Sequence, residues 1–327
     1  MFFKKNKSNV TYAKQEGDKD LGVLVNTPKI LPWSNNYLDE RNGAINLGTG
    51  FDDSVVKLDL NKTQNVLIAG EMGMGKTLLT KNIIWQLVNQ KSEVYIIELS
   101  GHYEFDSRYS IMGQVINDLN SLENLLKELL DEQEKRTLIL EEGGFKSFGA
   151  FNENRFDSRK LKRKVVVIDN YYNLLEKANI SSIEQIQVEI IEKSLIKLIS
   201  STKDTGINLI LNDNEIIKLN TELVNKIQVK ICGRHNELNS KLMLGNDRAR
   251  KLNCIASFLM KINNDIEFFE AYRFDEEKQL KILESIKVEG KEPTFKIDFE
   301  TDINTILPGT LGDGKNFVLK DRSEDCV

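Results

Sequence analysis

Eight consecutive residues in the first third of the chain carry its strongest chemical signal. Residues 70–77 read GEMGMGKT and fit the pattern GxxxxGK[ST]. Glycines in such a loop let backbone N–H groups converge on a phosphate, and Lys76 is placed to neutralise β- and γ-phosphate oxygens. The hydroxyl of Thr77 is of the kind that holds Mg²⁺ beside the phosphates. The motif therefore predicts a site for ATP with Mg²⁺.

The flanking residues provide the context that this motif needs. An apolar run, residues 65–69 (NVLIA), precedes it, and the residues after it repeat apolar side chains at helical spacing. The N-terminus of that helix adds positive partial charge to a phosphate site. The alternatives are a glycine-rich turn without a ligand and a loop that no longer binds tightly. The predicted nucleotide-binding residues are Gly70, Glu71, Met72, Gly73, Met74, Gly75, Lys76, Thr77 and Leu78.

A second acidic position follows another apolar run. Residues 165–168 (VVVI) predict a buried strand, and Asp169 comes directly after it. A carboxylate at the end of a neighbouring strand can reach Mg²⁺ through water, although a cap or turn residue is the alternative. The next residue is Asn170, whose amide can orient water but cannot accept a proton, a function typically worth about 10²- to 10⁴-fold in rate. Hydrolysis is therefore left open, and Glu98, after another strand, is a carboxylate that could act from the side.

The elements that must position these residues alternate between strand and helix. Short β-rich runs, several of them apolar without alternation, are typical of a parallel sheet buried on both faces. They are residues 65–69, 94–97, 165–168, 207–211 and 227–231. Helices are predicted at residues 77–88, 121–142, 181–201 and 275–286. The alternation of the two predicts an α/β fold.

Composition limits the classes of protein that remain. The chain has 327 residues, of which 40% are hydrophobic and 29% charged, so it can bury a sizeable core. Its net charge of −5 argues against a general polyanion binder, and any contact with nucleic acid must be local. The cysteines, at 232, 254 and 326, form no CxxC pair, which indicates a reducing cytoplasm. No apolar run reaches the roughly 20 residues that a transmembrane helix needs.

Two groups of basic residues are candidates for further contacts. Residues 155–164 contain only one acid and suit contact with a phosphate backbone, or else form a solvated loop that guards the next strand. Their basic residues are Arg155, Arg159, Lys160, Lys162, Arg163 and Lys164. Arg234, Arg248 and Arg250 are candidates for an arginine that reaches a neighbouring subunit's γ-phosphate, or are surface charges.

From about residue 47 to residue 286, the order of these blocks resembles the FtsK/SpoIIIE motors, which are RecA-like ATPases that form rings and pump double-stranded DNA. NVLIAGEMGMGKTLLTKNIIWQLV resembles the family's phosphate loop and its helix, and KVVVIDNYYNLLE its second acidic strand. GINLILNDNE resembles the strand before the sensor loop, and EFFEAYRFDEEKQLKIL the closing strand and helix. The family includes conjugative relatives and type VII secretion ATPases.

The resemblance implies a RecA-like P-loop domain at 47–286, an arm at 1–46 and a polar tail at 287–327. It implies catalytic positions that are occupied here by Lys76, Asp169, Asn170 and Asn214. The chain departs from the family where Asn170 replaces a glutamate, where residues 213–215 read DNE instead of Thr-Gln-Arg, and where Asn239 replaces an aspartate. These departures bear on pumping more than on the fold.

Two functions from different classes follow. The first is a cytoplasmic, ring-forming motor that uses ATP to move double-stranded DNA in transfer or segregation. The second is a nucleotide-binding coupling module of a secretion or conjugation machine, with a membrane-embedded partner and weak or absent hydrolysis. A small nucleotide kinase also uses a phosphate loop, but the sequence has no evident lid.

Overall fold

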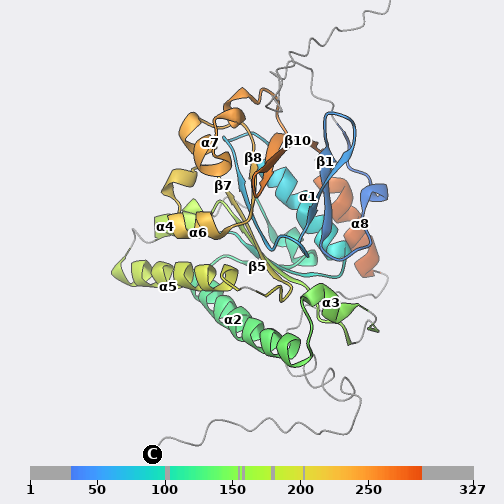
Figure 1. Ribbon diagram of the computed structural model, residues 1–327, viewed down its shortest axis with the longest axis vertical. Helices are drawn as coiled ribbons and strands as arrows, with labels where there is room; N and C mark the ends of the chain where they lie inside the picture. Colours follow the sequence, from blue (N-terminus) through green and yellow to red (C-terminus); the bar gives the residue numbers. More distant parts are fainter. Residues whose placement is uncertain are drawn as a thin grey trace, which may run out of the picture.

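The computed structural model describes residues 31–99, 104–153, 155–156, 159–177, 181–201 and 203–288. Within these residues, one 10-stranded sheet forms the centre of the molecule (Figure 1). Its strands, in their order across the sheet, are β2 (Val55–Asp59), β1 (Ala44–Thr49), β10 (Asp265–Ala271), β9 (Ser257–Ile262), β8 (Val229–Cys232), β3 (Asn65–Ala69), β7 (Ile207–Asp213), β6 (Lys164–Asp169), β4 (Glu93–Ile97) and β5 (Gln114–Ile116). The strands from β8 to β5 are parallel, and the others pair antiparallel. The predicted α/β fold with a mostly parallel sheet is confirmed.

Helices cover both faces of this sheet (Figure 1). They are α1 (Lys76–Asn89), α2 (Leu119–Glu142), α3 (Phe148–Asn152), α4 (Tyr172–Lys177), α5 (Ser182–Ile199), α6 (Thr221–Lys226), α7 (Glu237–Leu244) and α8 (Glu276–Val288), with short 3₁₀ turns η1 (Asn35–Tyr37), η2 (Ser107–Ile111), η4 (Ile216–Lys218) and η5 (Arg248–Lys251). Helices α1 and α8 contribute to one hydrophobic cluster. Helices α2, α5, α6 and α7 contribute to the cluster on the other face.

Strand β3 shows why the sequence runs apolar without alternation. Leu67 and Ala69 pack into the cluster with α2 and α5, while Val66 and Ile68 pack into the cluster with α1. All of these side chains are fully buried. Burying one Leu or Ile side chain contributes about 1.5–3 kcal/mol. Because each face of the strand needs apolar residues, the run has no polar position after Asn65.

Each predicted strand and helix is present, with ends shifted by a few residues. The hairpin β1–β2 and strand β9 escaped prediction because polar residues interrupt their apolar runs. In β2, for example, buried and exposed residues alternate over only five positions. Strands β9 and β10 are joined at a turn where Asn263 has a φ of 56°. That conformation suits asparagine better than most residues.

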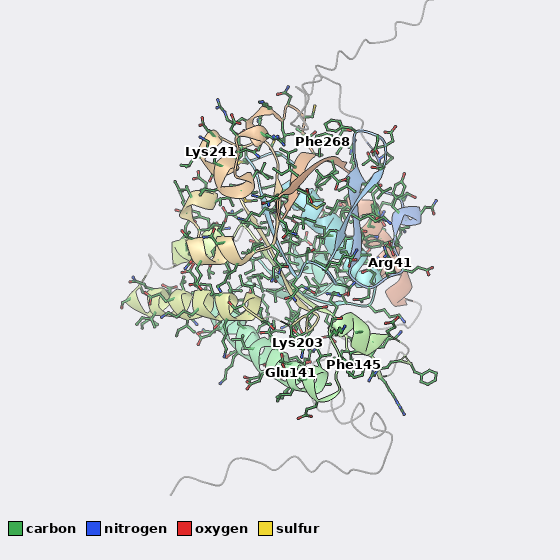
Figure 2. The ribbon with its side chains drawn as sticks, viewed as in Figure 1. Arg41, Glu141, Phe145, Lys203, Lys241 and Phe268 are labelled. Atoms are coloured by element: carbon green, nitrogen blue, oxygen red, sulfur yellow. The ribbon has the colours of Figure 1, made fainter. Side chains whose placement is uncertain are left out.

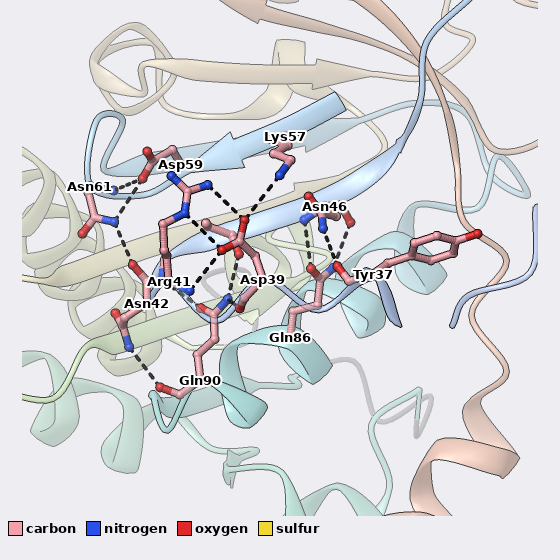
Figure 3. Close-up of polar contacts among 12 residues, drawn as sticks. Tyr37, Asp39, Arg41, Asn42, Asn46, Lys57, Asp59, Asn61, Gln86 and Gln90 are labelled. Carbon is pink, nitrogen blue, oxygen red and sulfur yellow. Dashed lines mark hydrogen bonds and ion pairs between the residues drawn. The ribbon is translucent and has the colours of Figure 1, made fainter. Parts of the chain in front are cut away.

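Residues before β3 are built into the sheet and fastened to α1 (Figure 3). The Gln86 side chain accepts a hydrogen bond from the N–H of Asn46 and donates one to its carbonyl, both at 2.9 Å. The Gln90 amide donates to the carbonyls of Asp39, at 3.0 Å, and Ala44, at 2.7 Å. The helix that carries Lys76 is therefore held against β1.

The boundaries of the arm, the P-loop domain and the tail stay predictions, and three observations bear on them. Trp33 is buried, and its ring lies 5.6 Å from that of Tyr272. Strand β1 begins at Ala44, so the predicted boundary between residues 46 and 47 falls inside a strand. At the other end, α8 extends to Val288. The rest of the tail, residues 289–327, lies outside the described residues, as do residues 1–30.

Candidate functional site

The loop of residues 70–75 follows β3 and turns back into α1. Gly70, Gly73 and Gly75 all have positive φ, of 155°, 81° and 89°. At Gly70 a Cβ would lie 3.3 Å from the Cα of Gly233, so both conformation and space favour glycine there. The N–H of Glu71 donates to the carbonyl of Arg234 at 2.8 Å. The β8–α7 loop therefore supports one side of the phosphate loop.

The N-terminus of α1 has the properties of an anion site. The helix begins at Lys76, and its N-cap, Gly75, provides no side-chain hydrogen bond to the first turn. Those N–H groups and the helix dipole favour a negatively charged ligand. At Gly73, a Cβ would meet no atom within 4 Å. The loop therefore has open space beside Gly73. Met72 and Leu78 are exposed.

Lys76 is buried at the centre of the site. Its Nζ donates to the carbonyl of Glu71 at 3.1 Å and to the Oδ1 of Asn214 at 2.5 Å. Burial lowers its pKa, and the charges of Asp169 and Asp213 oppose that shift. An ammonium that has lost most of its hydration gains strongly from a phosphate neighbour.

Asp169 ends β6 and is only 6% exposed. It lies opposite Asn212 in the β6–β7 register, and the amide of Asn212 donates a hydrogen bond to its Oδ1. Burial, followed by the charge of Glu98, raises the pKa of Asp169 to about 7, while Lys76 acts in the opposite direction. The site therefore disfavours an uncompensated carboxylate and would stabilise a cation beside it.

The residues fit Mg²⁺ bound together with phosphates. The Thr77 hydroxyl and the Asp169 carboxylate are oxygen donors, which Mg²⁺ prefers. The Oδ1 of Asn212, whose amide contacts Asp169, is buried without a hydrogen-bond partner. No cluster of three or more His, Cys, Asp or Glu residues suited to a metal occurs in the described part of the chain.

Two residues, Asn170 and Glu98, bear on whether this site hydrolyses ATP. Asn170 has a φ of 54°, a left-handed conformation that asparagine tolerates better than glutamate does. Glu98 follows β4, whose Ile97 lies beside Ile168 of β6, so continuing the parallel register places Glu98 next to Asp169. Ile97 and Ile168 both pack into the cluster with α2 and α5. Because successive side chains of a strand point to opposite faces of the sheet, Glu98 and Asp169 point to the face that α1 covers. Glu98 is 6% exposed.

The sensor segment after β7 contacts the phosphate loop through Asn214. The Asp213 carboxylate is buried and accepts hydrogen bonds from the N–H groups of Tyr172 at 2.6 Å and Glu215 at 2.7 Å. It thereby ties the segment after β6 to the segment after β7. Burial raises the pKa of Asp213. Lys76, Asp169 and Asn214, chosen from separate motifs, are thus brought together at the carboxyl ends of the strands.

The role of His235 and the pairing of Arg234 with Glu71 were not predicted from the sequence. His235 is 4% exposed and contacts the carbonyl of Asn214 at 2.7 Å through its Nε2. Arg234 pairs with Glu71 of its own phosphate loop at 2.9 Å, rather than pointing away as a free arginine. Because these contacts join loops far apart in sequence, no local pattern reveals them. Arg250 is paired with Glu237 at 3.0 Å.

The basic stretch of residues 155–164 does not form a free basic patch. Arg163 is fully buried, and Lys164 pairs with Glu93 at 3.3 Å. Lys162 also contacts Glu93, at 3.6 Å, and the Arg155 guanidinium lies 3.8 Å from the ring of Phe151. Arg163 and Lys164 are therefore not available for a phosphate-backbone contact, whereas Arg159, Lys160 and Lys162 lie at the surface, so a contact by these exposed residues stays a prediction. The stretch also precedes β6, near the end of the molecule where Figure 2 shows Glu141 and Lys203, whereas Lys241 on α7 lies at the opposite end.

Together, the mostly parallel α/β sheet, the glycine loop and the buried carboxylate of Asp169 define a P-loop ATPase fold. The model of the FtsK/SpoIIIE family matches residues 33–231, which is more than half of the chain. The chain belongs to the FtsK/SpoIIIE family. No helix in the described ranges has the length and apolar character that crossing a membrane requires.

Named relatives place the chain further within this family. It is 23% identical to the DNA translocase FtsK of Borreliella burgdorferi over 224 residues, which are 63% of this chain and 27% of that protein. It is 22% identical to the DNA translocase SpoIIIE of Bacillus subtilis over 203 residues, which are 58% of this chain and 25% of that protein. The chain thus spans about a quarter of the length of these relatives.

Solved structures agree with the fold. The conjugation coupling protein TcpA of pCW3, in a monomer form with ATPγS, is 32% identical with a TM-score of 0.74, covering 80% of this chain and 75% of that one. ATPases 2 and 3 of EssC from Geobacillus thermodenitrificans have a TM-score of 0.64 at 16% identity, covering 81% of this chain and 53% of that one. At that identity, the second likeness concerns the fold alone.

Proposed function

We propose that this chain binds ATP with Mg²⁺ and uses it to move double-stranded DNA, as a ring-forming motor in conjugative transfer. The observation that carries the proposal is the meeting of Lys76, Asp169 and Asn214 around the open N-terminus of α1. The likeness to TcpA, a conjugation coupling protein solved with ATPγS, supports the nucleotide and the process. The FtsK and SpoIIIE relatives, named as DNA translocases, support the polymer.

In this proposal each residue of the site has a separate task. Backbone N–H groups of the glycine loop hold the β-phosphate, and Lys76 turns toward the β- and γ-phosphates. Thr77 and Asp169 hold Mg²⁺, which neutralises phosphate charge when it is bound. Asn214 contacts the γ-phosphate or the attacking water. Glu98 accepts the proton of that water, because it is the buried carboxylate next to Asp169 in the register.

The alternative is a nucleotide-binding coupling module that does not hydrolyse ATP at a sustained rate. Asn170 favours it, because an amide stands where the family has a glutamate and cannot accept a proton. Its left-handed backbone also accepts glutamate poorly. In this alternative, nucleotide occupancy shapes contacts with a membrane-embedded partner and with other copies of the chain.

An ATPase assay with and without duplex DNA distinguishes the two functions. We expect duplex DNA to raise the ATPase rate of the full chain at least several-fold, and Lys76→Ala to abolish it because the loop loses its phosphate-binding cation. Glu98→Gln should reduce the stimulated rate by about 10²-fold while nucleotide affinity stays unchanged. Gln228→Ala is the control, since Gln228 is an exposed, uncharged residue at the amino end of β8, away from the site.

The possible results point in different directions. Tight nucleotide binding with a rate that ignores DNA, together with a change in sedimentation on adding nucleotide, would favour the coupling module. A Glu98→Gln variant that hydrolyses at the wild-type rate would remove Glu98 from the mechanism. A Lys76→Ala variant with full activity would contradict the proposed site.

A further inference from the structure

The β8–α7 loop, residues 233–236, contacts both nucleotide-facing loops. Gly233 donates its N–H to the carbonyl of Ala69 at 2.8 Å, and the carbonyl of Arg234 accepts from Glu71. The next residue, His235, contacts Asn214 instead. Asn236 then caps α7 by accepting from the N–H of Asn239 at 2.9 Å. One short loop therefore joins the phosphate loop, the sensor segment and α7.

The hydrogen bonds of His235 determine which ring nitrogen carries the proton. The N–H of Asn236 lies 3.0 Å from the Nδ1 of His235, and a backbone N–H can only donate. Nδ1 must therefore be unprotonated, and the ring is neutral with its proton on Nε2. That proton is donated to the carbonyl of Asn214 at 2.7 Å. Both nitrogens of this 4% exposed ring are thus used: Nε2 fixes the backbone of the sensor segment at Asn214, and Nδ1 fixes that of the β8–α7 loop at Asn236.

The contact with Lys76 determines the orientation of the Asn214 amide. An ammonium is only a donor, so the atom at 2.5 Å from Nζ must be the Oδ1 of Asn214. The NH₂ group of the same amide is then a hydrogen-bond donor beside the lysine that reaches the γ-phosphate. A donor at this position has a partner in a nucleoside triphosphate and lacks one in a diphosphate.

We propose that His235 is a positioning residue for γ-phosphate recognition: its ring holds the Asn214 carbonyl so that the Asn214 amide stands beside Lys76. This inference rests on the proposed nucleotide site and adds a way to distinguish ATP from ADP. Removing the ring frees the backbone of Asn214 and weakens contact with the γ-phosphate. The β-phosphate contacts, made by the glycine loop, are retained. The β8–α7 loop therefore connects the presence or absence of the γ-phosphate with the start of α7.

The charges around His235 define how this contact responds to pH. Glu71 and Lys76 face His235 from the phosphate loop, and Glu215 faces it from the sensor segment. Arg234, in the same loop as His235, forms an ion pair with Glu71. Burial lowers the pKa of His235 below its usual 6.5. Protonation of Nδ1 would remove the acceptor for Asn236 and place a second cation near Lys76. The preference for triphosphate is therefore complete above the His235 pKa and declines as the pH falls through it.

The test measures the affinities of the full chain for fluorescent ATPγS and ADP with Mg²⁺ at pH 7.5, and then at lower pH. His235→Ala is expected to weaken ATPγS binding about tenfold and ADP binding less than about twofold, the loss of roughly one oriented hydrogen bond. His235→Gln, whose amide can still donate to the Asn214 carbonyl, should recover most of the affinity. It should also lack the decline in triphosphate preference at low pH. Gln228→Ala removes one exposed side-chain hydrogen bond, to the N–H of Gln64, at the other end of β8 and serves as the control.

Each outcome decides between the inference and its alternatives. If His235→Ala weakens ATPγS and ADP equally, or neither, the inference is wrong even though the proposed nucleotide site stands. If the wild-type chain binds neither nucleotide, the proposed function fails first, and the inference fails with it. Should His235→Ala fail to fold by circular dichroism, the pH profile of His235→Gln decides. A low-pH decline as large as that of wild type would then overturn the role of His235.

Discussion

Asp169 illustrates at the scale of one residue how a binding site conflicts with stability. Its pKa is about 7 because burial and the neighbouring Glu98 disfavour the charged form. A carboxyl whose pKa is raised on folding binds a proton in the folded state that the unfolded state has released. The free energy of unfolding therefore decreases as the pH rises from 3.8 to about 7, and the full cost remains above that range.

Replacing this carboxyl should stabilise the empty protein. Without nucleotide and in EDTA, Asp169→Asn is expected to increase the free energy of unfolding at pH 8 by about 2–4 kcal/mol, since the amide keeps an acceptor for Asn212 and carries no charge. Near pH 4 the gain should almost vanish. Thermal unfolding across this pH range measures the difference. Equal stability of both proteins at pH 8 would show that Asp169 is not held in a strained, desolvated state.

Prediction from sequence succeeded for residues that belong to contiguous motifs. Lys76 and Asp169 follow apolar strands directly, so their places at the sheet edge could be anticipated. His235 and the Glu71–Arg234 pair act across loops far apart in the chain, and no spacing rule marks them. Nor did the sequence show that Asn170 has a left-handed backbone.

At the scale of elements, buried polar side chains hold the strands and helices in place around the site. Arg163 donates to the Oδ1 of Asn42 at 2.8 Å and of Asn61 at 2.6 Å, and also to Asn208 in β7. These residues connect the β1–β2 hairpin to the central strands. Burial lowers the pKa of Arg163 to about 10, and the charges of Asp204 and Asp59 oppose that shift.

Loss of Arg163 should therefore loosen the hairpin. Arg163→Ala removes a large buried side chain and leaves asparagine amides without donors, so we expect a loss of about 3 kcal/mol in the free energy of unfolding. Arg159→Ala, from the same basic stretch but exposed, should change it by less than about 0.5 kcal/mol. Chemical denaturation measures both. Similar small losses in the two variants would mean that Arg163 is not a structural residue.

The elements also show where periodicity carries information and where it does not. The buried strands β3, β6 and β7 were predicted because apolar runs between helices have few other interpretations. The antiparallel strands β1, β2 and β9 extend the sheet through pairing with distant segments. Their hydrogen bonds, such as those of β1 with β10, depend on the rest of the fold being present.

At the scale of the whole molecule, the nucleotide site and the basic stretch lie at opposite ends of the strands. The glycine loop follows β3 at the carboxyl edge, whereas residues 155–164 precede or begin β6 at the amino edge. With a net charge of −5 and with Arg163 and Lys164 buried, a DNA contact must be made by a few local residues. Assembly of several copies would multiply such contacts, in agreement with the proposed ring.

The account depends most directly on whether residues 70–77 and Asp169 bind a nucleotide together. Isothermal titration calorimetry of the full chain with ATPγS and Mg²⁺ tests this point. We predict saturable binding, which Lys76→Ala weakens at least about 100-fold and which EDTA reduces in the wild type. No heat of binding from ATPγS or GTPγS at millimolar concentration, with a folded chain and Mg²⁺ present, would contradict the motor and the coupling module alike.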